Sequence, residues 1–349
     1  MREIRVAIVG YGLAGSVFHA PLVQAQEGMR ITSVVTGNRE RQRQARVALP
    51  GVIVFDRVDE LWRRASDVDL VVVATPTESH VPLALEAVRR DVPVVVDKPF
   101  ATDPREAEEL LSAASDRGVA VTVFHNRRWD SDHLTLRRLL DAGSLGEVVR
   151  YESRFERWQP AVRSDRWRDT VPPERGGGSL LDLGSHVVDQ ACQLFGAAEV
   201  VHADVRAVRG GVSDDAVFLV LRHENGVHAH LSVGAVFGAP GPRLRVLGTD
   251  AAFVADRIDR QEDQLRAGIR PMHAAYGAEI DDRWGWLECG DQWEWVTPER
   301  GAWQEFYAGV ARALRDREPM PVDPHDALET QRLLADARTL AQQDAVVAR

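Results

Sequence analysis

The chain has 349 residues with 43 basic and 53 acidic side chains, which give a formal net charge of −10 at pH 7. This length predicts two domains, and charges mixed along the chain exclude a long basic surface for nucleic acid. No apolar run approaches the length of a membrane span, so we expect no membrane association. Cys192 and Cys289 are too few for a disulfide framework, and a strand at the N-terminus leaves no room for a secretion signal. We therefore expect a cytoplasmic protein.

The N-terminal segment has the pattern of a strand, a glycine turn and a helix. An apolar run at residues 4–9 is followed by GYGLAG. Gly10 would permit a tight turn, Gly12 would let a pyrophosphate approach the backbone, and Gly15 would let helix and strand pack closely. The helix N-terminus would offer free N–H groups to phosphates. We therefore expect a dinucleotide site whose turn comprises Gly10, Tyr11, Gly12, Leu13, Ala14 and Gly15.

Strands and helices then alternate as far as residue 124. The run LVVVA at residues 70–74 is continuously apolar, which is typical of a parallel strand covered on both faces. Asp103-Pro104 has the cap and the first-turn proline that open a helix. The alternation predicts an α/β fold with a doubly wound parallel sheet, that is, a Rossmann domain at residues 1–124. Its other strands are expected at residues 30–35, 52–55, 92–96 and 120–124.

Beyond residue 124 the pattern changes to strand-like segments separated by turn residues such as Asn225-Gly226. We expect a second domain at residues 125–349, of the α+β type, with a large and mostly antiparallel sheet. Its strands are expected at residues 148–155, 200–208, 217–222, 227–233 and 244–247. Its helices are expected at residues 131–142, 179–195, 303–315 and 326–341.

The end of the second strand is where a dinucleotide site usually carries an acidic residue for the adenosine ribose. This chain has Thr36, Asn38 and Arg39 there, and no carboxylate. Thr36 and Asn38 can donate hydrogen bonds, and Arg39 can bind a 2′-phosphate that a carboxylate would repel. These residues favour NADP as the cofactor over NAD. The alternative interpretation is a polar helix start without a ligand.

Lys98 lies at the carboxyl end of a predicted strand, in the sequence Asp97-Lys98-Pro99. Ligands of open α/β sheets bind at that edge, and a lysine beside a nicotinamide can polarise a hydroxyl or carbonyl oxygen. The alternative is a surface lysine before a helix. The position at the strand end favours the catalytic interpretation.

A second candidate site lies in GGGSLLDLGSHVVD, at residues 176–189. Asp182 and His186 are four residues apart, so a regular helix would place them on one face, with Asp189 nearby. A carboxylate can orient an imidazole, and imidazole titrates near neutral pH as a general base requires. Two alternatives are a structural ion pair and a metal site. We expect no metal, because no other histidine or cysteine cluster lies at ligand spacing.

The segment HNRRWD directly follows the last predicted Rossmann strand and can line a cleft with hydrogen-bond donors. Aromatic faces and arginines farther along, around Trp167, suit a polyol. The predicted substrate-binding residues are Asn126, Arg127, Arg128 and Trp167.

The motifs GYGLAG, ATPTESH, DKP and GGGSLLDLGSH, in this order, resemble the Gfo/Idh/MocA oxidoreductase family. The segments GYGLAGSVFHAPL, HNRRWD, DLGSHVVDQ and RQEDQLRAGIRP resemble its NADP-dependent scyllo-inositol dehydrogenase branch. The resemblance implies that Lys98, Asp182 and His186 are catalytic. It implies a cofactor site at Gly10, Tyr11, Gly12, Leu13, Ala14, Gly15, Thr36, Asn38, Arg39, Thr75, Pro76, Thr77, His80, Asp97 and Lys98.

The resemblance also implies a cis peptide bond before Pro99, and a homo-oligomer, dimer or tetramer, formed through an open sheet face of the second domain. Asp97 departs from the family, which usually has glutamate there. We expect hydride transfer between NADP and a ring CH–OH of a polyol or sugar. His186 would take the hydroxyl proton, Lys98 would polarise the oxygen, and Asp182 would orient the histidine. The alternatives are a nicotinamide-dependent glycosidase and a cofactor-sensing regulator without catalysis.

Overall fold

The computed structural model describes residues 3–347, which form two compact units. The first unit comprises the chain up to Asn126 together with Gln261–Tyr276 and Ala302–Leu328. The second unit comprises Arg127–Arg260, Gly277–Gly301 and the chain from Glu329 onward. The sequence analysis placed one boundary after residue 124. Two later segments, Gln261–Tyr276 and Ala302–Leu328, nevertheless group with the first unit.

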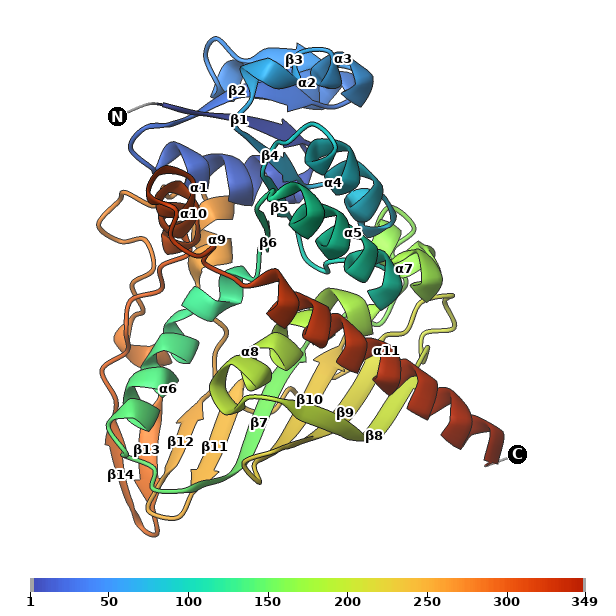
Figure 1. The fold of residues 1–349 in the computed structure, drawn as a ribbon. Helices are drawn as coiled ribbons and strands as arrows, with labels where there is room; N and C mark the ends of the chain where they lie inside the picture. Colours follow the sequence, from blue (N-terminus) through green and yellow to red (C-terminus); the bar gives the residue numbers. More distant parts are fainter. Residues whose placement is uncertain (1–2, 348–349) are drawn as a thin grey trace. The chain divides into compact units, whose positions relative to one another are not determined.

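The described part of the first unit contains one sheet of six parallel strands in the order β3-β2-β1-β4-β5-β6 (Figure 1). The doubly wound parallel sheet predicted from the sequence is thereby confirmed. The order reverses between β1 and β4, and ligands of such sheets bind at the carboxyl ends of the strands there. The strands are β1 Ile4–Val9, β2 Met29–Val35, β3 Ile53–Phe55, β4 Leu70–Val73, β5 Val94–Val96 and β6 Val121–Val123.

Two helices of the first unit begin at a side-chain cap. Asn38 accepts from the Arg41 N–H to start α2, and Asp103 accepts from the Arg105 N–H to start α5. The helices α4 and α5 lie side by side and bury apolar side chains against the sheet (Figure 1). The helical segments are η1 Ala14–His19, α1 Ala20–Gln24, α2 Arg39–Ala48, α3 Val58–Trp62, α4 His80–Val88, α5 Pro104–Arg117, α9 Gln261–Arg266 and α10 Gln304–Asp316.

The described part of the second unit contains a sheet of eight strands in the order β14-β13-β12-β11-β7-β10-β9-β8. Only β7 and β10 pair in parallel, so the sheet is mostly antiparallel, as predicted. The sequence analysis missed β12, β13 and β14, although Gly290-Asp291 between two short runs is a hairpin signal. The strands are β7 Val148–Glu156, β8 Ala198–Arg206, β9 Ala216–His223, β10 His228–Gly234, β11 Leu244–Gly248, β12 Ala252–Ala255, β13 Trp286–Cys289 and β14 Gln292–Trp295.

Helices cover one face of this sheet, where α6, α8 and the later part of α11 bury the main apolar core (Figure 1). The aligned residues Arg150, His228 and Arg222 on neighbouring strands are exposed, in keeping with an open opposite face. Within residues 3–347, no helix has the length and apolar composition needed to cross a membrane. The remaining helical segments are α6 Ser131–Asp141, α7 Trp167–Thr170, η6 Leu180–Gly184, α8 Ser185–Phe195 and α11 Pro324–Val347.

Candidate active site

The glycine turn after β1 is fixed by close contacts. Gly10 has φ +96°, and a Cβ there would lie 2.4 Å from the carbonyl oxygen of Ala74. A Cβ at Gly15 would lie 2.1 Å from the carbonyl oxygen of Gly10. Any side chain at these two positions would collide with backbone, so Gly10 and Gly15 serve the turn and the packing of helix on strand.

Gly12 differs from the other two glycines of this turn. The atoms nearest to a Cβ at Gly12 would be those of the Arg41 guanidinium, at 3.6 Å and beyond. Packing within the protein therefore tolerates a side chain at Gly12. The glycine instead suits the close approach of a ligand to the protein backbone. Arg41, which the sequence analysis did not single out, places its positive charge beside this turn. The open backbone at Gly12 and the Arg41 cation suit the pyrophosphate of a dinucleotide.

The end of β2 is ordered by its own polar groups. The Thr36 N–H donates to the carbonyl of Phe55 at 3.0 Å, and Gln42 Nε2 donates to the Thr36 carbonyl at 2.8 Å. Asn38 uses its side-chain oxygen as the cap of α2, which leaves its amide N–H groups as donors. Arg39 is exposed at the first position of α2. The next acid in the sequence, Glu40, is paired with Arg43, and the Asp56 carboxylate accepts from the same Gln42 amide that binds the Thr36 carbonyl.

The loops after β4 and β5 are joined by a buried histidine. His80 Nδ1 lies 2.9 Å from the carbonyl oxygen of Pro99, and its Nε2 lies 2.8 Å from the carbonyl oxygen of Thr75. Thr77 is buried, and Pro76 is exposed beside it. His80 thus contacts both predicted cofactor loops through its two ring nitrogens.

Lys98 follows β5 directly, and its backbone N–H donates to Asp97 Oδ1 at 2.9 Å. The Lys98–Pro99 peptide bond is cis, as the resemblance implies. Lys98 is also the single lysine among the 43 basic side chains of the chain. Arginine stays protonated at every pH a protein meets, whereas a lysine can lose its proton. The chain therefore has its one dissociable amine side chain at the carboxyl edge of the first sheet.

The predicted substrate arginines form ion pairs inside the second unit. Arg127 Nη1 lies 3.0 Å from Asp130 Oδ2, and its guanidinium lies 4.7 Å from the centre of the Phe155 ring. Arg128 is bidentate to Asp189, at 2.7 and 3.0 Å. Asp189 is therefore held by a cation. Asn126 is buried at the end of the first unit.

The glycine run before the Asp182 helix is required by its contacts. A Cβ at Gly177 would lie 1.7 Å from the Val171 carbonyl oxygen, and a Cβ at Gly178 would lie 2.2 Å from Asp214 Oδ2. Asp214 in turn accepts from the Leu180 N–H at 2.7 Å, at the start of the helix. The run therefore lets two loops pack against the helix N-terminus.

The helix itself is not regular. Asp182 lies in the π-helical segment η6, and His186 lies in the first turn of α8. The sequence analysis assumed one α-helix over both residues, and π-helical turns of this kind are frequent at functional sites. Asp182 Oδ1 lies 2.9 Å from Arg168 Nε, and its Oδ2 lies 3.7 Å from Arg166 Nη2. Two arginines thus face the two oxygens of this carboxylate.

His186 is buried and packs near an aromatic ring. Its ring centre lies 6.0 Å from that of Phe155, at 68° between planes. The Arg243 guanidinium lies 4.1 Å from the centre of the same Phe155 ring. Arg243 also donates to Gln190, one turn after His186, at 2.8 Å. A cationic and aromatic cluster therefore fixes the helix turn that bears the histidine.

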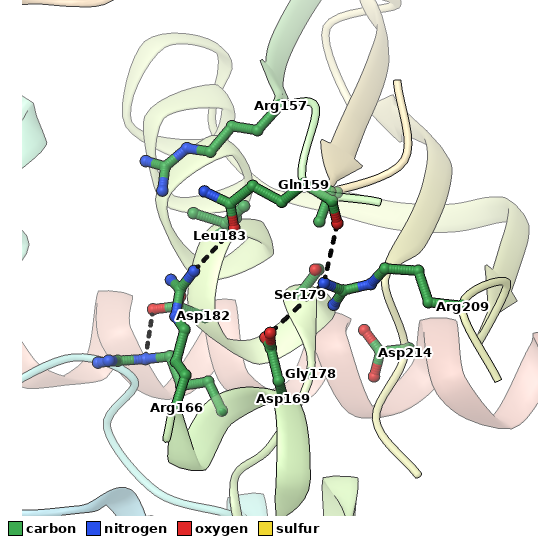
Figure 2. A pocket seen from close by; sticks show the side chains of 13 residues that line it. Arg157, Gln159, Arg166, Asp169, Gly178, Ser179, Asp182, Leu183, Arg209 and Asp214 are labelled. Atoms are coloured by element: carbon green, nitrogen blue, oxygen red, sulfur yellow. Dashed lines mark hydrogen bonds and ion pairs between the residues drawn. The ribbon is translucent and has the colours of Figure 1, made fainter. Parts of the chain in front are cut away.

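A polar pocket in the second unit includes the Asp182 carboxylate (Figure 2). Figure 2 shows Arg166 between Gln159 and Asp182, and Arg209 between the Gln159 backbone and Asp169. Trp167 lies beside it, with the Arg168 guanidinium 4.7 Å from its ring. The pocket is lined by Arg157, Gln159, Arg166, Arg168, Asp169, Gly178, Ser179, Asp182, Leu183, Arg209, Asp214, Gly234 and Ala235. In the described residues no group of three or more metal-ligating side chains is suited to a metal ion.

Comparison with known proteins identifies the class of oxidoreductase. Residues 4–125 match the model of the oxidoreductase family Gfo/Idh/MocA, NAD-binding Rossmann fold, and residues 137–348 match that family's C-terminal alpha/beta domain. The chain belongs to the Gfo/Idh/MocA oxidoreductase family.

Similar members cover nearly the whole chain. The scyllo-inositol 2-dehydrogenase (NADP(+)) IolW of Bacillus subtilis is 32% identical over 96% of this chain and 92% of its own. The uncharacterized oxidoreductase YdgJ of Escherichia coli is 34% identical over 95% and 94%. The structure of putative oxidoreductase yvaA from Bacillus subtilis superposes with a TM-score of 0.91 at 32% identity, over 98% and 97% of the two chains. This member of the family is therefore an NAD(P)-dependent oxidoreductase.

Each unit of this family member bears one part of the predicted catalytic set. Lys98 belongs to the first unit, and Asp182 and His186 belong to the second. Sequence reasoning missed Arg41 and Arg168. Arg41 lies two residues past Arg39 on the same predicted helix, so continuing along that helix would have found it. Arg168 gives no sequence signal for Asp182, because a loop and a glycine run separate the two residues.

Proposed function

We propose that this protein is an NADP-dependent dehydrogenase or reductase that acts on a CH–OH group of a cyclic polyol or sugar. The observation that carries the proposal is the single lysine of the chain at the carboxyl end of β5. A surface lysine without function would be replaceable by arginine, which this chain uses at every other such position. A compact ammonium group that must fit beside a reacting oxygen is not replaceable in this way, because the guanidinium group is larger and planar.

The residues present fit a bound dinucleotide. The turn of residues 10–15 would hold the pyrophosphate, since Gly12 leaves its backbone open to a ligand. Thr36, Asn38, Arg39 and Arg41 would surround the adenosine ribose and a 2′-phosphate, and the absence of a carboxylate among residues 36–39 favours NADP over NAD. When bound, the nicotinamide supplies the hydride acceptor or donor.

The protein's own residues would handle the proton. His186 would accept the proton of the reacting hydroxyl during oxidation and return it during reduction. Lys98 would donate a hydrogen bond to the same oxygen and stabilise its developing negative charge. Asp182 would orient the imidazole, and its own direction is set by Arg168 and Arg166. These residues act as positioned acid, base and electrostatic groups.

The substrate we propose is scyllo-inositol, or scyllo-inosose in the reductive direction. The relative IolW is named for this activity, and the predicted lining of Asn126, Arg127, Arg128 and Trp167 is rich in donors. Arg127 and Arg128 already pair with Asp130 and Asp189, so the choice of a ring with many hydroxyls rests on the relative and not on unpaired donors in this lining. We further propose a cytoplasmic homo-oligomer, a dimer or a tetramer, with the exposed sheet face of the second unit as its interface.

The experiment that tests the proposal follows the nicotinamide absorbance while candidate substrates are added to the purified protein with NADPH or NADH. The panel contains scyllo-inosose, other inososes, hexoses and simple ketones. We expect NADPH oxidation with an inosose and much slower oxidation of NADH. Failure of every inosose and hexose, or equal rates with a simple ketone, would overturn it.

A further inference from the structure

A buried polar chain in the first unit ends at the carboxylate beside Lys98. His19, in η1, is fully buried, and its Nδ1 lies 2.7 Å from the hydroxyl of Tyr307 in α10. Its Nε2 lies 3.8 Å from Asp97 Oδ1, the atom that also accepts from the Lys98 backbone N–H. The chain Tyr307–His19–Asp97 thus leads from a C-terminal helix to the base of the Lys98 side chain. Nothing in the proposed proton transfer uses His19 or Tyr307.

The direction of the hydrogen bond between Tyr307 and His19 follows from its chemistry. Burial raises the pKa of Tyr307 well above its usual value, so its hydroxyl keeps its proton and can donate to Nδ1 of His19. A neutral imidazole that accepts at Nδ1 carries its own proton on Nε2. That N–H faces Asp97, whereas the other tautomer would point a lone pair at a carboxylate.

The polar and charged groups around Asp97 keep it ionised. Burial by itself raises the pKa of Asp97, but His19, His80 and Lys98 together hold it below its usual value. These groups and Tyr307 come from η1, α4, the Lys98 turn and α10. The Phe124 ring, 4.3 Å from the His19 ring, closes the apolar side. Asp97 is one methylene shorter than the glutamate usual in the family, and these polar groups surround its carboxylate.

We propose that His19 is a positioning residue for Lys98, which acts through Asp97 to fix the turn from which the Lys98 side chain starts. The catalytic part of this inference rests on the function proposed above for Lys98. The structural link between His19, Asp97 and Lys98 does not depend on that function, because every contact in it lies within the first unit. His19 itself touches neither substrate nor reacting atoms and is not a catalytic residue.

The single lysine makes the link measurable without substrate. Protein labelled with ¹³C- and ¹⁵N-lysine gives one lysine side-chain signal in NMR spectra, and its pH titration reports on Lys98 alone. Asp97→Asn removes an anion near the amine, so the pKa of Lys98 falls. His19→Asn keeps an amide for Tyr307 but has no donor that reaches Asp97. The carboxylate then interacts more strongly with the ammonium group, so the pKa of Lys98 rises.

Two further variants separate positioning from general damage. His19→Gln places an amide donor near the position of Nε2, and it should restore the wild-type Lys98 titration. Thr122→Val removes a buried hydrogen bond to the Val322 carbonyl, of 2.8 Å, in the same unit. It should lower the melting temperature and leave the Lys98 titration unchanged. The double variant of His19→Asn and Asp97→Asn should titrate like Asp97→Asn alone.

Kinetics complete the test. His19→Asn should lower kcat about tenfold, because small misplacements of a reacting group are costly, with KM for NADPH unchanged. In a Lys98→Met background the same change should have no further effect. An unchanged Lys98 titration in His19→Asn overturns this inference even where the enzyme is active. An inactive wild-type enzyme with the expected titrations overturns the proposed function and leaves the link intact.

Discussion

The Nε atom of Arg168, in α7, lies 2.9 Å from Oδ1 of Asp182, so one carboxylate of the proposed catalytic set is paired with a cation of the preceding short helix. The carbonyl of Arg168 also accepts from the N–H of Gly178 at 3.0 Å, which ties α7 to the start of the helix that bears Asp182. The direction of Asp182 is therefore set from outside its own helix.

Arg168→Met should lower kcat/KM about tenfold, as expected when a charge-assisted contact is lost. Removing a cation favours the protonated forms of both Asp182 and His186, so the acid limb of the kcat/KM profile should move to higher pH. The control is Arg163→Met, shortly before α7, because the Arg163 guanidinium pairs with Asp165 at 3.7 Å. Identical pH profiles for the two variants would show that the Arg168 contact is without consequence for catalysis.

Arg39→Ala and Arg41→Ala should each weaken NADP binding roughly tenfold or more, because a charge-assisted phosphate contact contributes about 1.5–3 kcal/mol. NAD binding should change little in Arg39→Ala, since NAD lacks the 2′-phosphate, whereas Arg41→Ala should also weaken NAD binding because Arg41 lies beside Gly12 at the pyrophosphate turn. Arg43→Ala is the matched control on the same helix, where Arg43 pairs with Glu40. Titration of both cofactors by fluorescence measures the effect. Tighter binding of NAD than of NADP by the wild-type protein contradicts the NADP assignment.

His186→Ala should lower turnover by roughly 10²–10⁴ while the cofactor still binds, which is the usual contribution of a general base. Lys98→Arg is the sharper test of the lysine, because it keeps the positive charge and removes the dissociable amine. We expect Lys98→Arg and Lys98→Met both to be strongly impaired in steady-state assays. Near-normal turnover of Lys98→Arg would mean that charge alone is needed at this position.

Deoxygenated ring analogues should react much more slowly than scyllo-inosose. A site that pairs several hydroxyl groups leaves its own polar groups unpaired when one hydroxyl is missing, and such sites discriminate strongly. The measurement compares kcat/KM for the inosose, its monodeoxy analogue and cyclohexanone with NADPH. Comparable values for cyclohexanone would exclude a polyol-specific site.

The buried His133 gives the stability of the second unit a defined pH dependence. Burial lowers the pKa of His133 to about 4. The hydrogen bond with Gln193, whose side-chain oxygen lies 2.8 Å from Nε2, raises this pKa but offsets only part of the effect of burial. The unfolded chain binds this proton near the usual histidine pKa, so stability is lost as pH falls from that value toward 4. The loss should reach about 3 kcal/mol.

His133→Gln removes the titrating group and keeps an amide that can reach Gln193. The difference in unfolding free energy between wild type and this variant should stay constant above neutral pH and change between pH 7 and about 4. Urea unfolding at several pH values measures it. A difference that does not vary over this range would show that His133 is solvated or already charged in the folded protein.

Local sequence patterns were enough to predict the parallel sheet, the glycine turn and the position of Lys98 after a strand. Apolar periodicity and turn residues act over a few neighbours, and they were enough to give the six strands of the first sheet and five of the second. Strands β13 and β14 were missed although Gly290-Asp291 marks the turn between them; in β14, which lies at the edge of the sheet, Trp293 and Trp295 are exposed, so the strand lacks a buried face.

Which polar groups come into contact depends on the packing of segments that are distant in the sequence. His19 and Tyr307 are 288 residues apart, and no local pattern relates an imidazole near the N-terminus to a hydroxyl in α10. Arg41 beside Gly12 and Arg168 on Asp182 likewise depend on how loops fold back over helix ends. Ion pairs and hydrogen bonds need a few ångströms of precision between distant segments. That precision comes from the packing of the whole core, and the sequence pattern of any one segment does not contain it.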